Sequence, residues 1–501
     1  MKFARILSLF LVLLTLLSVF AACGENPVET TGESQKPVTD NDRDQIEDSV
    51  PKNLKYNNET VTFFVRSDND IFKYELACEK LLNDPLYDAI HYRNIDVETR
   101  LGVSIKTIEQ DGSFNNRTAW NERLSTSVLT NSGDYDGTAF YLSTGSALAK
   151  DGIFYNLCDL EKGSGGYLEF SKPWWNQSLV DELGVFGTLF FVGGSLTISQ
   201  AANGYCVFFN RDMFNEKFPE EGDAGLYQLV RDGKWTADKM ANYISQVWTD
   251  TNSNGVVDDG DIVGVLSHAT AGGEGSLLDA WIPAMGLKIT ETNMFGEVEL
   301  ALINSRTVPA YEKMRKIFSN NPGALLTATS TVETTMPNGT VLFITQKLDY
   351  GTEMRESQVN YGVVPSPKYD EEQDTYYTGF GNVASALAIC SNLSSSRAEM
   401  VSAVLEVLSA ESYKQVVPVY YGTILQGRYS REQADAEMYN LILDSFVFSF
   451  GFAYSSLSLD GVGAIFRNLS PNFDIQNHID SKKDSWATKL EELLEALEAV
   501  S

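Results

Sequence analysis

The most regular set of oxygen-bearing side chains lies in residues 250–261, a loop rich in Asp, Asn and Gly. Its oxygen ligands fall at loop positions 1, 3, 5, 9 and 12, and Gly255 takes position 6, where an EF-hand-type calcium loop turns sharply. Asp replaces the usual Glu at position 12, so the pattern predicts weak, structural Ca²⁺ binding, in the range of about 10⁻⁴–10⁻³ M. The alternative is an Asn/Gly-rich turn without metal. The predicted ligands are Asp250, Asn252, Asn254, the Val256 carbonyl, Asp258 and Asp261.

Catalytic motifs are poorly represented. The chain has three histidines, His91, His268 and His478, and none shows metal-ligand spacing. A Gly-x-Ser-x-Gly elbow and a Gly-Lys-Ser/Thr phosphate loop are both missing from the sequence. Residues 379–384 match a dinucleotide fingerprint only superficially, because no apolar strand precedes them and no helix follows. We therefore expect no enzyme activity and no organic cofactor.

The acidic composition narrows the choice of partners. The chain of 501 residues has a formal net charge of −30. Nucleic acid needs a basic face, so a nucleic-acid partner is not expected. The charge also disfavours docking of the folded body on anionic lipid. A solvated, acidic surface suits an exported protein.

The N-terminus predicts export and a lipid anchor. Lys2 and Arg5 precede an uncharged apolar run over residues 6–20, and two alanines then lead to Cys23. This order is typical of a signal peptide over residues 1–22, and it resembles the lipobox of bacterial lipoproteins, in which the cysteine is acylated. An ordinary signal peptide with an incidental cysteine is the alternative. Residues 23–57 are polar and are expected to form a disordered, lipid-anchored tether on the outer face of the cell membrane.

Beyond the tether, short apolar runs alternate with amphipathic stretches. Strands are expected at residues 60–65, 136–142, 188–193, 205–210, 340–345, 361–365 and 384–389. Helix starts are expected at Thr236, ahead of an apolar face that includes Trp248, and at capping boxes that begin at Ser396 and Ser430. This alternation predicts an α/β protein with parallel sheets, and the length predicts two lobes.

Several motifs in this order resemble the extracellular solute-binding proteins (family 1) of carbohydrate ABC importers. They are Lys172-Pro173-Trp174-Trp175-Asn176, Leu189-Phe190-Phe191-Val192-Gly193-Gly194, Tyr361-Gly362-Val363-Val364-Pro365 and Ala410-Glu411-Ser412-Tyr413-Lys414. The resemblance implies a two-lobed periplasmic-binding-protein-like (type II) fold with hinge strands and an interlobe cleft. Lobe 1 would comprise residues 58–203 and 377–422, and lobe 2 residues 204–376 and 423–501.

The resemblance also implies capture of a sugar or oligosaccharide in the cleft and its delivery to an ABC importer permease by a monomer. Flat aromatics and polar groups at strand ends are the candidates for contact with such a ligand, with core packing as the alternative for each aromatic. They are Arg66, Asp68, Tyr141, Trp174, Trp175, Tyr205, Trp281, Phe380 and Asn382. The rival functions are a sensory or scaffold lipoprotein that binds a peptide or protein, and a secreted glycosidase.

Overall fold

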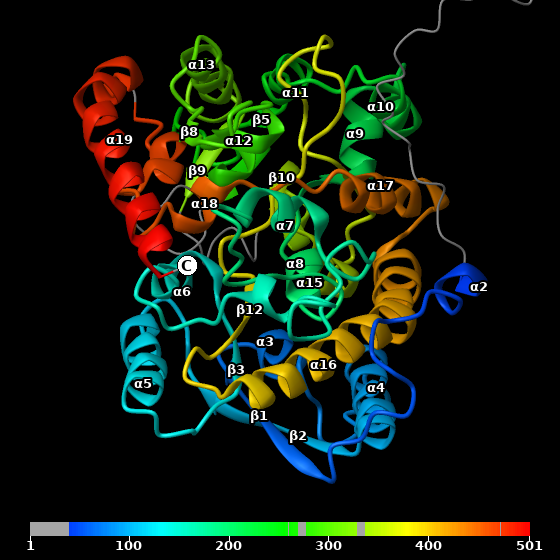
Figure 1. The fold of residues 1–501 in the computed structure, drawn as a ribbon. Helices are drawn as coiled ribbons and strands as arrows, with labels where there is room; N and C mark the ends of the chain where they lie inside the picture. Colours follow the sequence, from blue (N-terminus) through cyan, green and yellow to red (C-terminus); the bar gives the residue numbers. More distant parts are fainter. Residues whose placement is uncertain (1–39, 259, 269–276, 328–335, 471, 501) are drawn as a thin grey trace, which may run out of the picture. The chain divides into compact units, whose positions relative to one another are not determined.

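The computed structural model describes residues 40–258, 260–268, 277–327, 336–470 and 472–500 (Figure 1). The chain divides into Met1–Gln45 and Ile46–Ser501. The first unit contains the short helix α2 (Asp40–Arg43). No helix in the described ranges is both long and apolar enough to cross a membrane. The predicted signal peptide and Cys23 lie outside the described residues.

The second unit contains two larger sheets. The first sheet has the order β12-β3-β1-β2 and is built from β1 (Glu59–Arg66), β2 (Val103–Gln110), β3 (Gly137–Tyr141) and β12 (Ser385–Ile389). Strand β1 runs parallel to both β2 and β3, whereas β12 is antiparallel to β3. The all-parallel prediction is therefore wrong for β12, which enters the sheet from a crossover and not through a β-α-β connection.

The second sheet has the order β11-β4-β10-β6-β5, with β9 also paired to β6. Its strands are β4 (Tyr205–Asn210), β5 (Trp248–Thr249), β6 (Ile262–His268), β9 (Ala324–Thr327), β10 (Val341–Lys347) and β11 (Tyr361–Val364). Strands β6, β9 and β10 are parallel, and β4 is antiparallel to β10 and β11. Here too the crossover strand, β4, makes the sheet mixed.

Helices cover both sheets. Helix α4 contacts β2 and is itself packed by α16, while α9, α11 and α17 contact strands of the second sheet (Figure 1). The helices between Asp70 and Ile244 are α3 (Asp70–Tyr74), α4 (Pro85–Leu101), α5 (Arg117–Leu129), α6 (Leu142–Gly145), α7 (Gln177–Leu183), α8 (Ile198–Ala202), α9 (Arg211–Lys217), α10 (Gly222–Arg231) and α11 (Ala237–Ile244). The later ones are η3 (Leu277–Ala280), α12 (Trp281–Ala284), α13 (Thr307–Phe318), α15 (Gly351–Glu356), α16 (Ser395–Glu411), α17 (Gln433–Asp444), α18 (Phe450–Tyr454), η8 (Val462–Arg467) and α19 (Ile475–Ala499).

Two aromatic clusters support the sheets. In the first, the Phe64 ring stacks between Trp120 and Tyr135, with centroids 4.4 and 4.6 Å away. In the second, Phe343 packs against Trp235 at 5.7 Å and Phe214 at 6.1 Å. These large buried rings pack against the two sheets within one continuous hydrophobic core.

The segments that join the two sheets are hydrogen-bonded to one another. Gly204, directly before β4, forms an antiparallel bridge with Phe380, directly before the return to β12. The Tyr205 amide donates to the Gly379 carbonyl at 3.0 Å, and the Gly381 amide donates to the Asn203 carbonyl at 2.8 Å. A third segment, around Phe446, is bonded to these two, because Phe446 and Thr378 form a parallel bridge. We call residues 203–205, 378–381 and 445–447 the hinge segments.

Candidate functional site

Four polar side chains from distant parts of the chain meet where the two sheets adjoin. Tyr141 ends β3 of the first sheet, Tyr205 begins β4 of the second, Asp279 lies in η3 and Arg467 ends η8. Asp279, Arg467 and Tyr141 all act electrostatically on the Tyr205 hydroxyl, and both tyrosines in turn act on Arg467. We call these four residues the junction cluster.

Asp279 and Arg467 form the charged part of the junction cluster. Arg467 Nε donates to Asp279 Oδ1 at 2.8 Å, and Nη2 donates to Oδ2 at 2.5 Å. Burial raises the pKa of the Asp279 carboxyl, and the guanidinium opposes this effect. Burial alone would lower the pKa of Arg467, but the hydrogen bonds and charge of Asp279 outweigh it and raise that pKa. The pair therefore presents a rigid, bidentate polar surface.

The Tyr205 hydroxyl supplies a neutral donor. The side chain is 1% exposed, and its hydroxyl has no hydrogen-bond partner among the described residues. Burial raises its pKa well above the ordinary value, so the hydroxyl keeps its proton. A buried polar group without a partner costs about 1–3 kcal/mol, so a ligand or water that bonds this hydroxyl removes a penalty.

Arg66 and Asp68 lie beside the junction cluster at the end of β1. The Arg66 guanidinium lies 4.5 Å from the centroid of the Tyr141 ring. It bonds Asp68 at 3.0 and 2.5 Å and the Val383 carbonyl at 2.6 Å. The adjacent Asn382 accepts a backbone bond from Ser143 at 3.3 Å. The structure thus brings Arg66, Asp68, Tyr141 and Asn382 together, as their positions at strand ends suggested.

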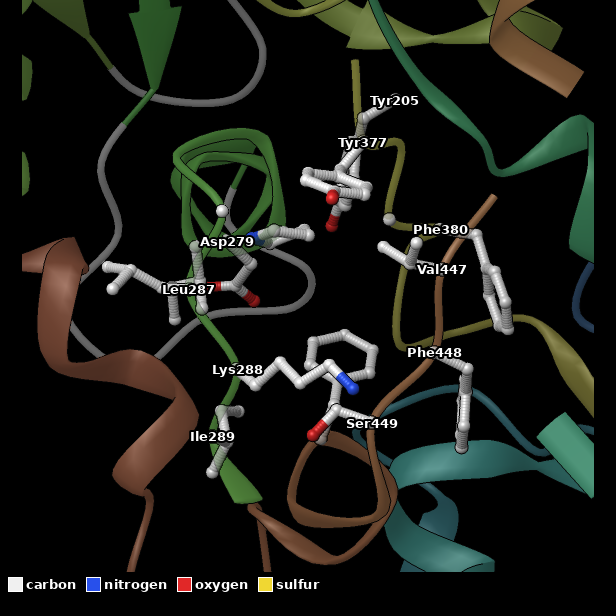
Figure 2. Close-up of a pocket in the computed structure, with 15 residues that line it drawn as sticks. Tyr205, Asp279, Leu287, Lys288, Ile289, Tyr377, Phe380, Val447, Phe448 and Ser449 are labelled. Carbon is white, nitrogen blue, oxygen red and sulfur yellow. The ribbon is translucent and has the colours of Figure 1, made fainter. Parts of the chain in front are cut away.

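A cavity of about 160 Å³ adjoins the junction cluster, and we call it the junction pocket. Tyr205 and Asp279 belong to both. Figure 2 shows Phe380 and Phe448 on one side of the pocket, opposite Asp279 and Leu287. Phe380 and Phe448 stack with centroids 5.5 Å apart and planes 20° from parallel. An apolar, aromatic wall with a few fixed polar groups is typical of the lining of a small-molecule site, although such sites usually have volumes of about 300–1,000 Å³.

Three predicted tryptophans are buried in the core. Trp174 and Trp175 are 0% and 2% exposed, and Trp175 Nε1 donates to Glu406 Oε2 on α16 at 3.1 Å. Trp281 is 0% exposed and packs edge-on against Phe318 of α13 at 5.2 Å. These three rings therefore pack in the core, which was the alternative to contact with a ligand. The glycine loop before Trp281 lies outside the described residues.

Sequence patterns did not indicate Asp279 and Arg467 of the junction cluster. They also did not indicate Tyr377, Lys288 and Phe448, which line the junction pocket. Asp279 had a weak signal, because it follows a glycine-rich loop and precedes Trp281 by two residues. Arg467 had none, since its partner is 188 residues away in sequence.

Most described residues of the predicted calcium loop are exposed, although Asp261 is buried, and the loop is internally hydrogen-bonded. Asp258 accepts bonds from the side-chain amides of Asn252 at 3.0 Å and Asn254 at 2.5 Å, and Asp250 accepts a bond from the Gly255 amide at 2.7 Å. Asp261 accepts from the Thr251 amide at 3.0 Å, and Gly255 has φ +76°. In the described part of the chain, no group of three or more His, Cys, Asp or Glu side chains is arranged to hold a metal. Calcium binding by this loop stays a prediction.

Comparison with solved structures identifies the class of fold. No protein-family model and no curated protein matches the chain. Solved structures of sugar-binding components of ABC transporters match nearly its whole length, and the chain has their two-lobed α/β solute-binding fold. The resemblance seen in the sequence is thereby confirmed for the fold.

Three of these structures illustrate the match. A cyclo/maltodextrin-binding protein complexed with maltotetraose has a TM-score of 0.53 at 10% identity, over 89% of this chain and 98% of that one. The galacto-N-biose-/lacto-N-biose I-binding protein of Bifidobacterium longum has a TM-score of 0.53 at 10% identity, over 87% and 99%. A solute-binding protein of Agrobacterium radiobacter K84, in complex with ribitol, has a TM-score of 0.51 at 13% identity, over 87% and 99%.

Proposed function

We propose that this protein captures a sugar or short oligosaccharide between its two lobes and delivers it to an ABC importer. The junction cluster is the observation that carries the proposal, because Tyr141 comes from the first sheet and Tyr205 from the second. Relatives in fold hold maltotetraose, lacto-N-biose and ribitol, which are all polyhydroxylated. A ligand with many hydroxyls suits a site that combines a neutral donor, a fixed ion pair and aromatic walls.

Each part of the site has a role in this proposal. The Asp279 carboxylate accepts hydrogen bonds from sugar hydroxyls, while Arg467 holds that carboxylate in place. Tyr205 donates to a sugar oxygen, and the pair Phe380 and Phe448 offers an apolar surface to the C–H face of a ring. Such a ligand touches both lobes, so it favours the arrangement in which the lobes are close, and the hinge segments let them move.

The same proposal places the protein outside the cell. Acylation of Cys23 would anchor it to the outer face of the membrane, and the polar segment up to residue 57 would leave the lobes free to meet the permease. The chain would act as a monomer and as a binding protein, not an enzyme. Ca²⁺ at residues 250–261 would stabilise the second lobe and take no part in ligand binding.

Thermal unfolding of the purified protein with maltotetraose, lacto-N-biose and ribitol tests the proposal. A ligand at one hundred times its dissociation constant adds about 2.7 kcal/mol of stability. Tyr205→Phe removes only a hydroxyl and should weaken binding about 3- to 10-fold, as expected for one neutral hydrogen bond. Tyr92→Phe, at a residue 54% exposed, is the matched control. A flat response to a broad saccharide set overturns sugar capture, and released hydrolysis products would indicate a glycosidase instead.

A further inference from the structure

A surface groove separate from the junction pocket lies between α19 and the hairpin of β7 (Thr290–Thr292) and β8 (Val298–Leu300). Its volume is about 550 Å³. Leu490 and Leu494 of α19 and Val298 and Leu300 of β8 give it an apolar floor. Phe186 also lines it and remains 50% exposed.

The rim of this groove is acidic. Among the described residues that line it, none is Lys, Arg or His. The nearest base along α19, Lys489, pairs with Glu492 at 2.6 Å and lines a different surface. The lining glutamates are Glu297, Glu299, Glu491, Glu495 and Glu498.

Several of these glutamates repel one another within the folded chain. Glu491 and Glu495 are one helical turn apart on α19, and Glu299 lies directly opposite Glu291 in the hairpin. Like charges at both spacings destabilise their own element. A bound cation would relieve this repulsion.

The turn of the same hairpin exposes two large apolar side chains. Met294 is 91% exposed and Phe295 is 80% exposed, and their neighbours Asn293 and Glu297 line the groove. Contiguous exposed apolar groups beside polar residues mark interaction sites on soluble proteins.

We propose that this groove docks a cationic polypeptide segment that carries an apolar side chain between Lys or Arg residues. The apolar group would rest on Leu490, Leu494 and Phe186, and the cations would meet the glutamate rim. A second copy of the chain is disfavoured, because its net charge of −30 and its own acidic groove repel the first. Anionic lipid is disfavoured for the same reason. The proposal stands whether or not the junction pocket takes a sugar.

Fluorescence anisotropy of a labelled peptide with alternating Lys and Leu residues tests the docking. The charge-removing pair Glu491→Gln/Glu495→Gln should weaken binding at least tenfold. The control pair Asp480→Asn/Glu492→Gln removes the same charge from the same helix outside the groove and should change binding less than twofold. Phe186→Asn should weaken binding about threefold or more, and the residue's φ of +54° suits Asn.

The outcomes separate the groove from general charge attraction. Equal losses in the groove pair and the control pair would show that the peptide senses only the net charge, and they would overturn the proposal. Equal binding of a peptide with Ser in place of Leu would overturn the apolar part. Peptide binding must also persist without saccharide. Concentration-dependent dimerisation that the groove pair abolishes would assign the groove to a second copy and overturn the cationic partner.

Discussion

Asp279 and Arg467 are joined by two hydrogen bonds, of 2.8 and 2.5 Å, across 188 residues of sequence. This pair fixes the last turn of η8 to η3, and both charges act on the Tyr205 hydroxyl. The C-terminal segment is therefore part of the candidate site and not an appendage to it.

Breaking this ion pair should be costly for stability and for binding. Asp279→Ala leaves the Arg467 guanidinium buried without its carboxylate, which typically costs about 3–5 kcal/mol. Arg467→Met retains the apolar stem but leaves the buried Asp279 carboxylate without its partner, so it should also destabilise the fold. A double-mutant cycle followed by chemical denaturation measures the coupling, and additive single effects would contradict it. The exposed pair of Arg231 and Glu437 serves as the control and should couple by less than about 1 kcal/mol.

The hinge depends on a glycine at position 204. A Cβ at this position would lie 2.5 Å from the Phe446 ring, so Gly204→Ala forces two hinge segments apart. We expect a loss of about 1–3 kcal/mol in the free energy of unfolding and weaker ligand binding. Phe446→Ala should restore part of the loss in the double variant. At Gly422 an added Cβ meets nothing within 4 Å, so Gly422→Ala is the control and should unfold like the parent.

Stability should fall as the pH rises from about 4.5 to 7. Burial raises the pKa of Glu406 from its ordinary 4.5 to about 7, against the hydrogen bonds from the Glu169 amide and the Trp175 indole. The folded state therefore binds more protons than the unfolded state between pH 4.5 and 7. The protonated Glu406 contributes its full stability below pH 4.5, and this contribution is lost as the pH rises through 7. The full shift corresponds to roughly 3 kcal/mol as an upper limit.

Glu406→Gln removes this titration. The variant should be more stable than the parent at pH 8 and should show a flatter pH profile, measured by chemical denaturation at several pH values. Glu220→Gln, at an exposed site, should leave the profile unchanged. Burial similarly raises the pKa of Glu75 to about 7, so a parent profile that stays flat in this window would contradict both assignments.

The sequence predicted most of the strands that carry strong apolar runs, but it missed β6 (Ile262–His268) and the short β9. The expected strand over residues 205–210 coincides with β4, and those at 60–65 and 384–389 fall within one residue of β1 and β12. Strand β2 was missed because its sequence, Val103–Gln110, is half polar and only its first part is buried. The expected strand at 188–193 is wrong, because this segment makes isolated bridges and not a ladder.

Helix starts were predictable only where a single capping residue stands alone. Thr236 caps α11 as expected, with its hydroxyl accepting from the Lys239 amide. The capping box at Ser396 is wrong, because Ser394 is the cap and three consecutive serines make the start ambiguous. The box at Ser430 is also wrong, since Glu432 and Asp435 form the box of α17. Trp248 is 38% exposed in β5, because α11 ends at Ile244, before its apolar face reaches this residue.

Only those residues of the candidate ligand site that local sequence patterns mark were predictable. Tyr141, Tyr205 and Phe380 stand at strand ends or crossovers, which local patterns reveal. Asp279 and Arg467 meet only because of the path of the whole chain, and no local pattern records that path. The tryptophans became candidates because of their residue type, but residue type does not distinguish a core position from a ligand contact.

Cys23 provides a test of the proposed anchor. Cys23→Ser should release the protein from cell membranes into the soluble fraction and abolish incorporation of labelled palmitate. The matched control is Cys158→Ser, at a partly exposed free cysteine of the folded unit, which should keep both label and membrane association. Persistent labelling of the Cys23 variant would show that another residue carries the lipid.

Calcium should stabilise the second lobe through the loop at residues 250–261. With a dissociation constant of about 10⁻⁴–10⁻³ M, 10 mM Ca²⁺ adds roughly 1.4–2.7 kcal/mol, and chelator should remove this gain. Asp250→Ala and Asp258→Ala should each abolish the effect, whereas Asp232→Ala, outside the loop, should not. Melting temperatures measured with Ca²⁺, with Mg²⁺ and with chelator test this prediction. A calcium response that survives both loop variants would place the ion elsewhere, and no response at 10 mM would leave this segment an Asn/Gly-rich turn.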